Sequence, residues 1–172
     1  TGMTRALCEA GAHVILNGRY EARLKKFQTE HGKFSTEIAA FDVADFAASE
    51  KFFASRKQLD VLVNNAIAMT PAPMAPLTPQ AFDETYRSSV TAAFAASRAA
   101  LPALRAAVEA NGAASIINIS SMYGLGAPDS RIYANPDQAS PLHYGPAKAA
   151  LLQLTRHLAA EFGKDGIRAN AL

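Results

Sequence analysis

Tyr144 and Lys148 lie four residues apart, which makes them the first candidates for chemistry in this chain. In a helix, side chains at this spacing project from the same face, one turn apart. A tyrosine hydroxyl with an ordinary pKa of about 10 is a poor proton donor at neutral pH, and a fixed cation beside it lowers that pKa. The pair is therefore suited to proton transfer to a carbonyl or from an alcohol. Tyrosine and lysine also meet at this spacing by chance, so the interpretation depends on the surrounding elements.

Short apolar runs bounded by turn residues predict the β-strands of the chain. These runs cover residues 13–17, 35–41, 60–64, 115–120 and 167–172. Their apolar side chains continue without a polar alternate, which is typical of strands covered on both faces.

Helical patterns separate the strands and supply the helix that carries Tyr144. They cover residues 3–10, 21–30, 45–56, 79–110 and 144–162. The longest of them is expected to bend near Pro102, and the last ends at Gly163. Alternation of strands and helices predicts an α/β fold with a doubly wound parallel sheet, which we assign to a single domain, residues 1–172.

Composition excludes several other classes of protein. The chain has 172 residues, of which 49% are hydrophobic and 19% charged, and its net charge of +2 gives no basic patch for nucleic acid. No apolar run approaches the roughly 20 residues that span a bilayer, and no signal peptide opens the chain, so we expect a cytoplasmic protein without a membrane partner. Cys8 is alone and is expected to be a buried core residue. The histidines show no metal-ligand spacing, so no metal site is predicted.

Short motifs follow one another in an order that points to a known family. They are EAGAHV at 9–14, FDVAD at 41–45, LVNNA at 62–66, INISS at 117–121, YGPAK at 144–148 and GIRAN at 166–170. With these motifs the chain resembles the classical short-chain dehydrogenase/reductases over nearly its whole length. The resemblance implies a Rossmann-like, dinucleotide-binding fold and a small-molecule alcohol or carbonyl substrate.

The resemblance also implies catalytic roles. Tyr144 would be the general acid/base and would also contact the cofactor. Lys148 would hold the nicotinamide ribose and lower the Tyr144 pKa. Ser121 would hydrogen-bond the substrate oxygen where negative charge develops. The alternative for Ser121 is a hydroxyl at a strand end that caps its own backbone. For the other two residues, the alternative is a tyrosine at a helix start beside a solvated lysine.

Residues 16–19 carry the signal for the choice of cofactor. Enzymes that prefer NAD place an acid after the second strand of this fold, where it binds the ribose 2′-hydroxyl. That place is held here by Gly18 and is followed by Arg19, whose guanidinium can bind a 2′-phosphate in forked geometry. The sequence therefore favours NADP(H) over NAD, unless Arg19 is a solvated turn residue.

Further cofactor contacts come from the resemblance alone. Asp42 and Val43 match the family pair that contacts the adenine. Asn64 and Ala66 match the loop at a strand end beneath the cofactor.

Three departures from the family pattern affect the predicted site. Ser89 occupies the place of an asparagine that extends the proton relay from the lysine, so it is kept as a candidate in that role. Ile67 replaces a glycine. Ser121 and Tyr144 stand 23 positions apart, and the extra length at 127–142 is expected to wall the substrate pocket. With this extra segment the chain resembles the family members that are similar to gluconate 5-dehydrogenase or to 3-oxoacyl reductases.

The family pattern also extends beyond both ends of the chain. The first strand with its glycine-rich turn, and the last strand with the substrate lid, are expected to be absent. We therefore expect a gap between the strands at 13–17 and 60–64, and we expect these residues alone to aggregate or to fail to bind cofactor.

The sequence thus favours an oxidoreductase that transfers a hydride between NADP(H) and a secondary alcohol or ketone, sugar- or polyol-like. Two alternatives stay open: a related NADP-binding protein without turnover, and a nucleotide-sugar epimerase or dehydratase of the extended branch. The resemblance implies a homodimer or homotetramer that forms through the helices at 82–110 and 144–162.

Overall fold

The computed structural model describes residues 2–69, 76–135 and 139–172. Five strands are found within these ranges, close to the predicted positions. They are β1 (Val14–Gly18), β2 (Thr36–Ala40), β3 (Val61–Asn64), β4 (Ala114–Asn118) and β5 (Ile167–Ala171).

The α-helices alternate with these strands, as the sequence predicts. They are α1 (Gly2–Glu9), α2 (Glu21–Glu30), α3 (Phe46–Ala54), α4 (Pro79–Tyr86), α5 (Ala92–Asn111) and α6 (Tyr144–Phe162). Side-chain caps set two of the starts, because Asp45 and Thr78 accept hydrogen bonds from the amides of Ala48 and Ala81. Gly112, with a φ of 80°, supplies the left-handed residue that ends α5.

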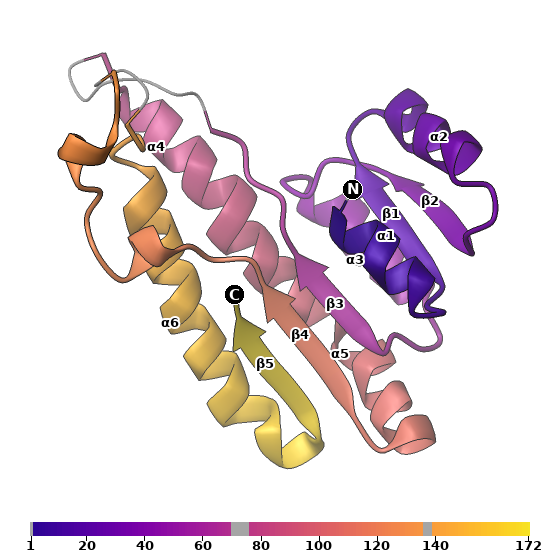
Figure 1. Ribbon diagram of the computed structural model, residues 1–172. Helices are drawn as coiled ribbons and strands as arrows, with labels where there is room; N and C mark the ends of the chain where they lie inside the picture. Colours follow the sequence, from indigo (N-terminus) through magenta and orange to yellow (C-terminus); the bar gives the residue numbers. More distant parts are fainter. Residues whose placement is uncertain (1, 70–75, 136–138) are drawn as a thin grey trace.

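The predicted parallel sheet is found as two separate sheets (Figure 1). One contains β1 and β2, with Val14 opposite Thr36. The other has the order β3-β4-β5, in which Val61 lies opposite Ser115 and Ala114 opposite Ile167. All pairs are parallel, and within the described residues β1 and β3 do not pair with each other. The gap expected between these two strands is therefore present.

The hydrophobic core belongs to the three-stranded sheet and the helices packed on it. Leu104 of α5, Ile116 of β4 and Ile167 of β5 are 0% exposed and lie at its centre. Leu158 of α6 packs in the same cluster. Strands β3 to β5 and the two long helices thus form the part of the protein with a continuous buried interior.

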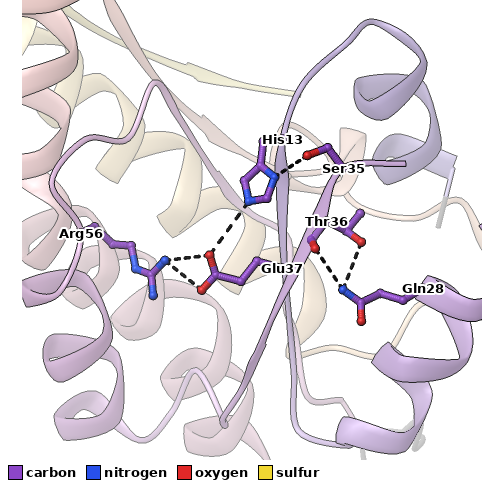
Figure 2. A network of polar contacts seen from close by, with 6 residues as sticks. All are labelled: His13, Gln28, Ser35, Thr36, Glu37 and Arg56. Carbon is purple, nitrogen blue, oxygen red and sulfur yellow. Dashed lines mark hydrogen bonds and ion pairs between the residues drawn. The ribbon is translucent and has the colours of Figure 1, made fainter. Parts of the chain in front are cut away.

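A network of polar contacts surrounds the two-stranded sheet (Figure 2). Glu37 of β2 lies between the Arg56 guanidinium at 2.9 Å and the His13 ring at 4.0 Å. His13 also contacts the Ser35 hydroxyl at 2.7 Å. Only a few apolar side chains are buried in this region, among them Leu16 and the predicted core residue Cys8. The prediction that the strands are covered on both faces is therefore wrong for β1 and β2, whose residues are mostly half-exposed.

The single long helix predicted for residues 79–110 is interrupted. A π-helical turn, η1 (Arg87–Thr91), separates α4 from α5, whereas Pro102 lies inside α5. The hydroxyls of Ser88 and Ser89 both bond to the carbonyl of Thr85, at 3.2 and 2.5 Å. Serine hydroxyls that bond back to the preceding turn compete with the regular amide bonds and distort helices. The irregular turn therefore lies where these serines are, rather than at the proline.

Candidate active site

Lys148 is buried in the second turn of α6, although it is a lysine. The residue is 3% exposed, and its Nζ donates a hydrogen bond to the carbonyl oxygen of Ile119 at 2.5 Å. The same Nζ lies 5.5 Å from the centre of the Tyr144 ring. Burial disfavours the charged amine and lowers the pKa of Lys148. The structure therefore places the ammonium beside the phenol, as the helical spacing predicts.

The end of β4 holds this turn of α6 from the other side. The Ser120 hydroxyl donates to the carbonyl oxygen of Lys148 at 3.0 Å, so Ser120 and Ile119 bind both ends of the same residue. Both contacts are buried or half-buried, where a hydrogen bond is difficult to replace by water. Sequence reasoning assigned no role to Ser120, and only its place beside Ser121 in the INISS motif pointed to it.

Two glycines let the backbone after β4 approach α6 closely. The 3-10 turn η2 (Met122–Gly124) packs on α6, and a Cβ at Gly124 would lie 2.9 Å from the backbone carbon of Lys148. A Cβ at Gly145 would lie 2.9 Å from the carbonyl oxygen of Tyr123. A real Cβ does not come so close, so both positions require glycine. The approach fixes the backbone after Ser121 against the first turns of α6.

Ser121 lies between β4 and η2 and is half-buried. Its hydroxyl oxygen accepts a hydrogen bond from the amide of Tyr123 at 3.2 Å, so the serine caps its own backbone as the alternative reading holds. The hydroxyl hydrogen is not used in that bond and can still be donated to another oxygen. The cap orients the side chain and is compatible with the predicted role.

A buried polar chain connects the carboxyl ends of the central strands to α6. Asn64 at the end of β3 donates to Asn118 at the end of β4, at 2.8 Å. Asn118, which is 0% exposed, donates to the Thr155 hydroxyl at 2.8 Å, and Thr155 donates to the carbonyl of Leu151 at 2.7 Å. Asn64 is therefore a structural partner of the strand ends and is absent from the lining of the neighbouring pocket.

An open pocket of about 130 Å³ lies at the carboxyl ends of β1, β2 and β3. Of the eight residues predicted to contact a cofactor, five line this pocket, and Asn64, Tyr144 and Lys148 do not. The five are Gly18, Arg19, Asp42, Val43 and Ala66. Sites of this kind bind ligands at the carboxyl edge of parallel strands. Residues far apart in the chain that the sequence assigns to a cofactor thus line one pocket, and their cofactor contacts stay a prediction.

Arg19 is the cation at the rim of this pocket. Its guanidinium lies 3.9 Å from the Asp42 carboxylate, and its side chain is 56% exposed. An ion pair that is so exposed and so long is weak, so the guanidinium remains available to an anion. Asp42 also accepts a hydrogen bond from the Ala44 amide at 2.9 Å, which holds its carboxylate near its own backbone.

The π-helical turn places its two serines differently. Ser88 lines the pocket, and its hydroxyl accepts a hydrogen bond from the Ala68 amide at 2.8 Å. Ser89 is 4% exposed and bonds to Thr85 of the preceding turn. The family motif selected Ser89, which takes the place of the asparagine, and assigned no role to Ser88. The relay role of Ser89 stays a prediction.

Ile67, the second departure from the family pattern, lines the same pocket beside Ala66 and Ala68. The Thr85 hydroxyl donates to the Ala68 carbonyl at 3.0 Å, so the loop after β3 is fixed to α4 despite the bulkier side chain. The isoleucine therefore becomes part of the pocket wall.

His143 immediately precedes Tyr144 and is 0% exposed. Among the described residues neither of its ring nitrogens has a hydrogen-bond partner. Burial lowers its pKa, so the ring is neutral at physiological pH. Within the described ranges no cluster of acidic, histidine or cysteine residues fits a metal ion, and no helix is long and apolar enough to cross a membrane.

Comparison with known proteins gives matches over almost the whole chain. The family model described as enoyl-(acyl carrier protein) reductase matches residues 1–172. A probable 2,4-dienoyl-CoA reductase of Bacillus subtilis is 32% identical over 177 residues, which cover 99% of this chain and 65% of the relative.

Solved structures show the same similarity. An NADP complex of RhlG from Pseudomonas aeruginosa has a TM-score of 0.86 and 28% identity, over 98% of this chain and 64% of that one. A gluconate 5-dehydrogenase from Burkholderia cenocepacia, in complex with NADP and tartrate, has a TM-score of 0.77 and 28% identity, over 97% and 62%. The chain thus spans slightly less than two thirds of the length of these proteins.

Proposed function

Because the chain belongs to the short-chain dehydrogenase/reductase family, we propose that the protein reduces a ketone, or oxidises the matching secondary alcohol, with NADP(H). The observation that carries the proposal is the buried Lys148 ammonium beside the Tyr144 ring. A lysine in a protein interior with a carbonyl as partner costs stability, and such perturbed groups are concentrated at functional sites.

Tyr144 is proposed as the general acid and base. In the direction of reduction its hydroxyl gives a proton to the carbonyl oxygen, and in oxidation the phenolate takes the proton from the alcohol. Ser121 donates its free hydroxyl hydrogen to the same oxygen, which stabilises the negative charge that develops there. Lys148 stabilises the phenolate form through its positive charge. NADPH, when bound, supplies the hydride for the carbonyl carbon and leaves as NADP⁺.

The proposed binding of NADP(H) rests on the pocket at the carboxyl ends of β1, β2 and β3. Its lining by Gly18, Arg19 and Asp42 is compatible with an adenosine ribose, and the exposed guanidinium of Arg19 is suited to a 2′-phosphate. The NADP complexes of the two structural relatives support the same cofactor. A homodimer or homotetramer that forms through α5 and α6 is also proposed, on the family resemblance.

The experiment mixes the purified full-length protein with NADPH and a panel of ketones, keto-sugars and 3-oxoacyl thioesters, and follows NADPH absorbance. We expect turnover with part of the panel and a loss of about 10³-fold in Tyr144→Phe, since general acid catalysis contributes about 10²–10⁴-fold. Tyr86→Phe is the control, because Tyr86 stacks on Phe82 of α4 and is not among the residues that line the pocket. Tight NADPH binding without turnover on any carbonyl would instead favour a binding protein, and turnover only of nucleotide sugars would favour an epimerase or dehydratase.

A further inference from the structure

The walls of the pocket at the carboxyl ends of β1, β2 and β3 are mostly chain segments that follow strands. Its lining comes from residues 17–19, 41–43 and 66–68, and from Ser88, which lies in the π-helical turn η1. Beyond the end of a strand the hydrogen bonds of the sheet stop, so the shape of such a segment depends on other partners for its backbone groups. The side chains of α4 and η1 supply these partners for two of the three walls.

Ala68, in the wall that follows β3, is bonded at both of its backbone groups. The Ser88 hydroxyl oxygen accepts a hydrogen bond from the Ala68 amide at 2.8 Å, and the Thr85 hydroxyl donates to the Ala68 carbonyl oxygen at 3.0 Å. Thr85 is 1% exposed and Ser88 6%, and residues three apart lie on the same face of a helix. In Figure 1 the magenta segment that leaves β3 runs alongside α4. These two hydroxyls therefore fix the wall that contains Ala66 and Ile67.

Arg87, the residue before Ser88, contacts the segment that follows β2. Its guanidinium donates to the Ala44 carbonyl oxygen at 2.9 Å and lies 4.4 Å from the centre of the Phe46 ring. The Ala44 amide in turn donates to the Asp42 carboxylate at 2.9 Å. Ala44 is thus also bonded at both backbone groups, directly after the wall residues Asp42 and Val43.

On the premise of the proposed function, we infer that Thr85, Arg87 and Ser88 are positioning residues for NADP(H). They hold the walls after β2 and β3 at a fixed separation before the cofactor arrives. The irregular turn η1 lets two consecutive residues, Arg87 and Ser88, reach two different walls. A binding site that is preformed in this way loses less conformational entropy when its ligand binds. The three side chains therefore act on cofactor affinity through the backbone of Ala44 and Ala68, and not on the proton transfer at Tyr144.

The first test removes the hydroxyl that binds the Ala68 amide. Ser88→Ala should raise the NADPH dissociation constant of the full-length protein by about tenfold, measured by titration of NADPH fluorescence, because a half-buried amide loses its partner. Ser49→Ala is the matched control. Ser49 of α3 is also buried, at 3% exposed, but is not among the residues that line the pocket, so its variant should keep the wild-type affinity.

A pair of variants at Thr85 separates the hydroxyl bond from simple packing. Thr85→Val keeps the volume and removes the bond to the Ala68 carbonyl, so the NADPH dissociation constant should rise by about tenfold. Thr85→Ser keeps the hydroxyl and removes a buried methyl, so it should lower stability but leave the affinity within about twofold of wild type. An equal loss of affinity in both variants would show that packing sets the affinity, and would overturn the inference.

The contact of Arg87 is exposed, so water replaces part of it and a smaller effect is expected. Arg87→Met should raise the NADPH dissociation constant by about threefold. Arg98→Met is the control, because Arg98 is also exposed and also lies over an aromatic ring, that of Phe94 at 6.0 Å. The control should bind NADPH as wild type does. A loss in Arg98→Met as large as that in Arg87→Met would contradict a specific role for Arg87.

Amide hydrogen exchange without cofactor gives a readout that does not depend on activity. Ser88→Ala should make exchange about tenfold faster in residues 66–69 and leave residues 43–46 unchanged, and Arg87→Met should accelerate exchange at 43–46 only. Exchange that is unchanged in both segments would overturn the inference.

Two outcomes separate this inference from the proposed function. Wild-type affinity for NADPH in both Ser88→Ala and Thr85→Val, in a protein that still reduces a carbonyl, would overturn the inference alone. A wild-type protein that does not bind NADPH would overturn the proposed function and this inference with it. For any carbonyl that is reduced, kcat of the three variants at saturating NADPH should stay within about twofold of wild type, since only binding is affected.

Discussion

The region that carries Tyr144 and the region that carries Arg19 are held together in different ways. The first is built on the buried cluster of β3, β4, β5, α5 and α6, and its site residues are fixed by buried hydrogen bonds and close backbone contacts. The second is a pair of strands with polar contacts such as Glu37 with Arg56, shown in Figure 2. Proton transfer needs groups placed to within a fraction of an ångström, whereas an exposed guanidinium can adapt to a phosphate. The difference teaches that the buried hydrogen bonds and close backbone contacts are concentrated where we propose that the proton moves.

The largest change in stability is expected when a glycine of the Tyr144 region, rather than one of the Arg19 region, is replaced by alanine. Gly124→Ala should destabilise the protein by about 2 kcal/mol or more and abolish most activity, because its Cβ would meet the Lys148 backbone at 2.9 Å. In Gly18→Ala the nearest atom is Cδ2 of the flexible Leu24 side chain at 3.3 Å, so the loss should stay below about 1 kcal/mol. Chemical denaturation of both variants measures the two losses in the free energy of unfolding. Equal losses would show that the two regions do not differ in tolerance.

Replacement of Lys148 is expected to change stability less, and to increase it. Lys148→Met should stabilise the protein by about 1 kcal/mol while removing activity, because the variant no longer buries an ammonium. The pKa of Lys148 is lowered in the folded state, so the unfolded chain holds the proton more strongly and stability rises with pH. The penalty is complete below the folded pKa and disappears as pH rises through the unfolded value of about 10.4.

Denaturation midpoints at about pH 7 and about pH 10 check this prediction, because the gap between wild type and Lys148→Met should narrow at the higher pH. A wild-type protein that is more stable than the variant at neutral pH would contradict the account of a lysine retained for function. Lys51→Met is a suitable control, because Lys51 lies on the outer side of α3 and is exposed.

The smallest effect is expected in the polar network of the nucleotide region. Glu37→Gln should cost about 0.5–1 kcal/mol, because Glu37 is 40% exposed and its pair with Arg56 is partly screened by water. Raising the salt concentration should reduce that cost further. Glu50→Gln, in a more exposed pair with Arg98 at 3.6 Å, should change stability by less. A Glu37→Gln loss as large as that of Gly124→Ala would remove the contrast between the regions.

Sequence predicted the elements well where one physical signal dominates. The strand at 60–64 and the helix at 144–162 are found almost unchanged, because apolar runs and helical periodicity define them without help from distant residues. The helix at 79–110 was predicted less well. Its π-helical turn depends on two serine hydroxyls that compete for the Thr85 carbonyl, and no residue pattern distinguishes these serines from ordinary helix positions.

The residues of the candidate site likewise fall into those that the sequence predicts and those that it does not. Tyr144, Lys148 and the residues that line the pocket were selected because their spacing or their family motif is visible in the chain, and their roles stay predictions. Ser88 and Ser120 were missed, since their roles come from contacts with Ala68 and Lys148 that only the folded chain brings together. The close contact between η2 and α6 at Gly124 and Gly145 could not be predicted either. The neighbours of a glycine in sequence do not show whether it faces another backbone or open space.

The most direct test of the account measures single-turnover oxidation of bound NADPH at saturating ketone, in Tyr144→Phe and Arg19→Gln side by side. We predict that Tyr144→Phe slows this step by about 10³-fold and leaves the NADPH dissociation constant within about twofold. Arg19→Gln should weaken NADPH by about tenfold, with an unchanged rate once cofactor is saturating. A Tyr144→Phe variant that keeps the wild-type rate would contradict the assignment of proton transfer to Tyr144.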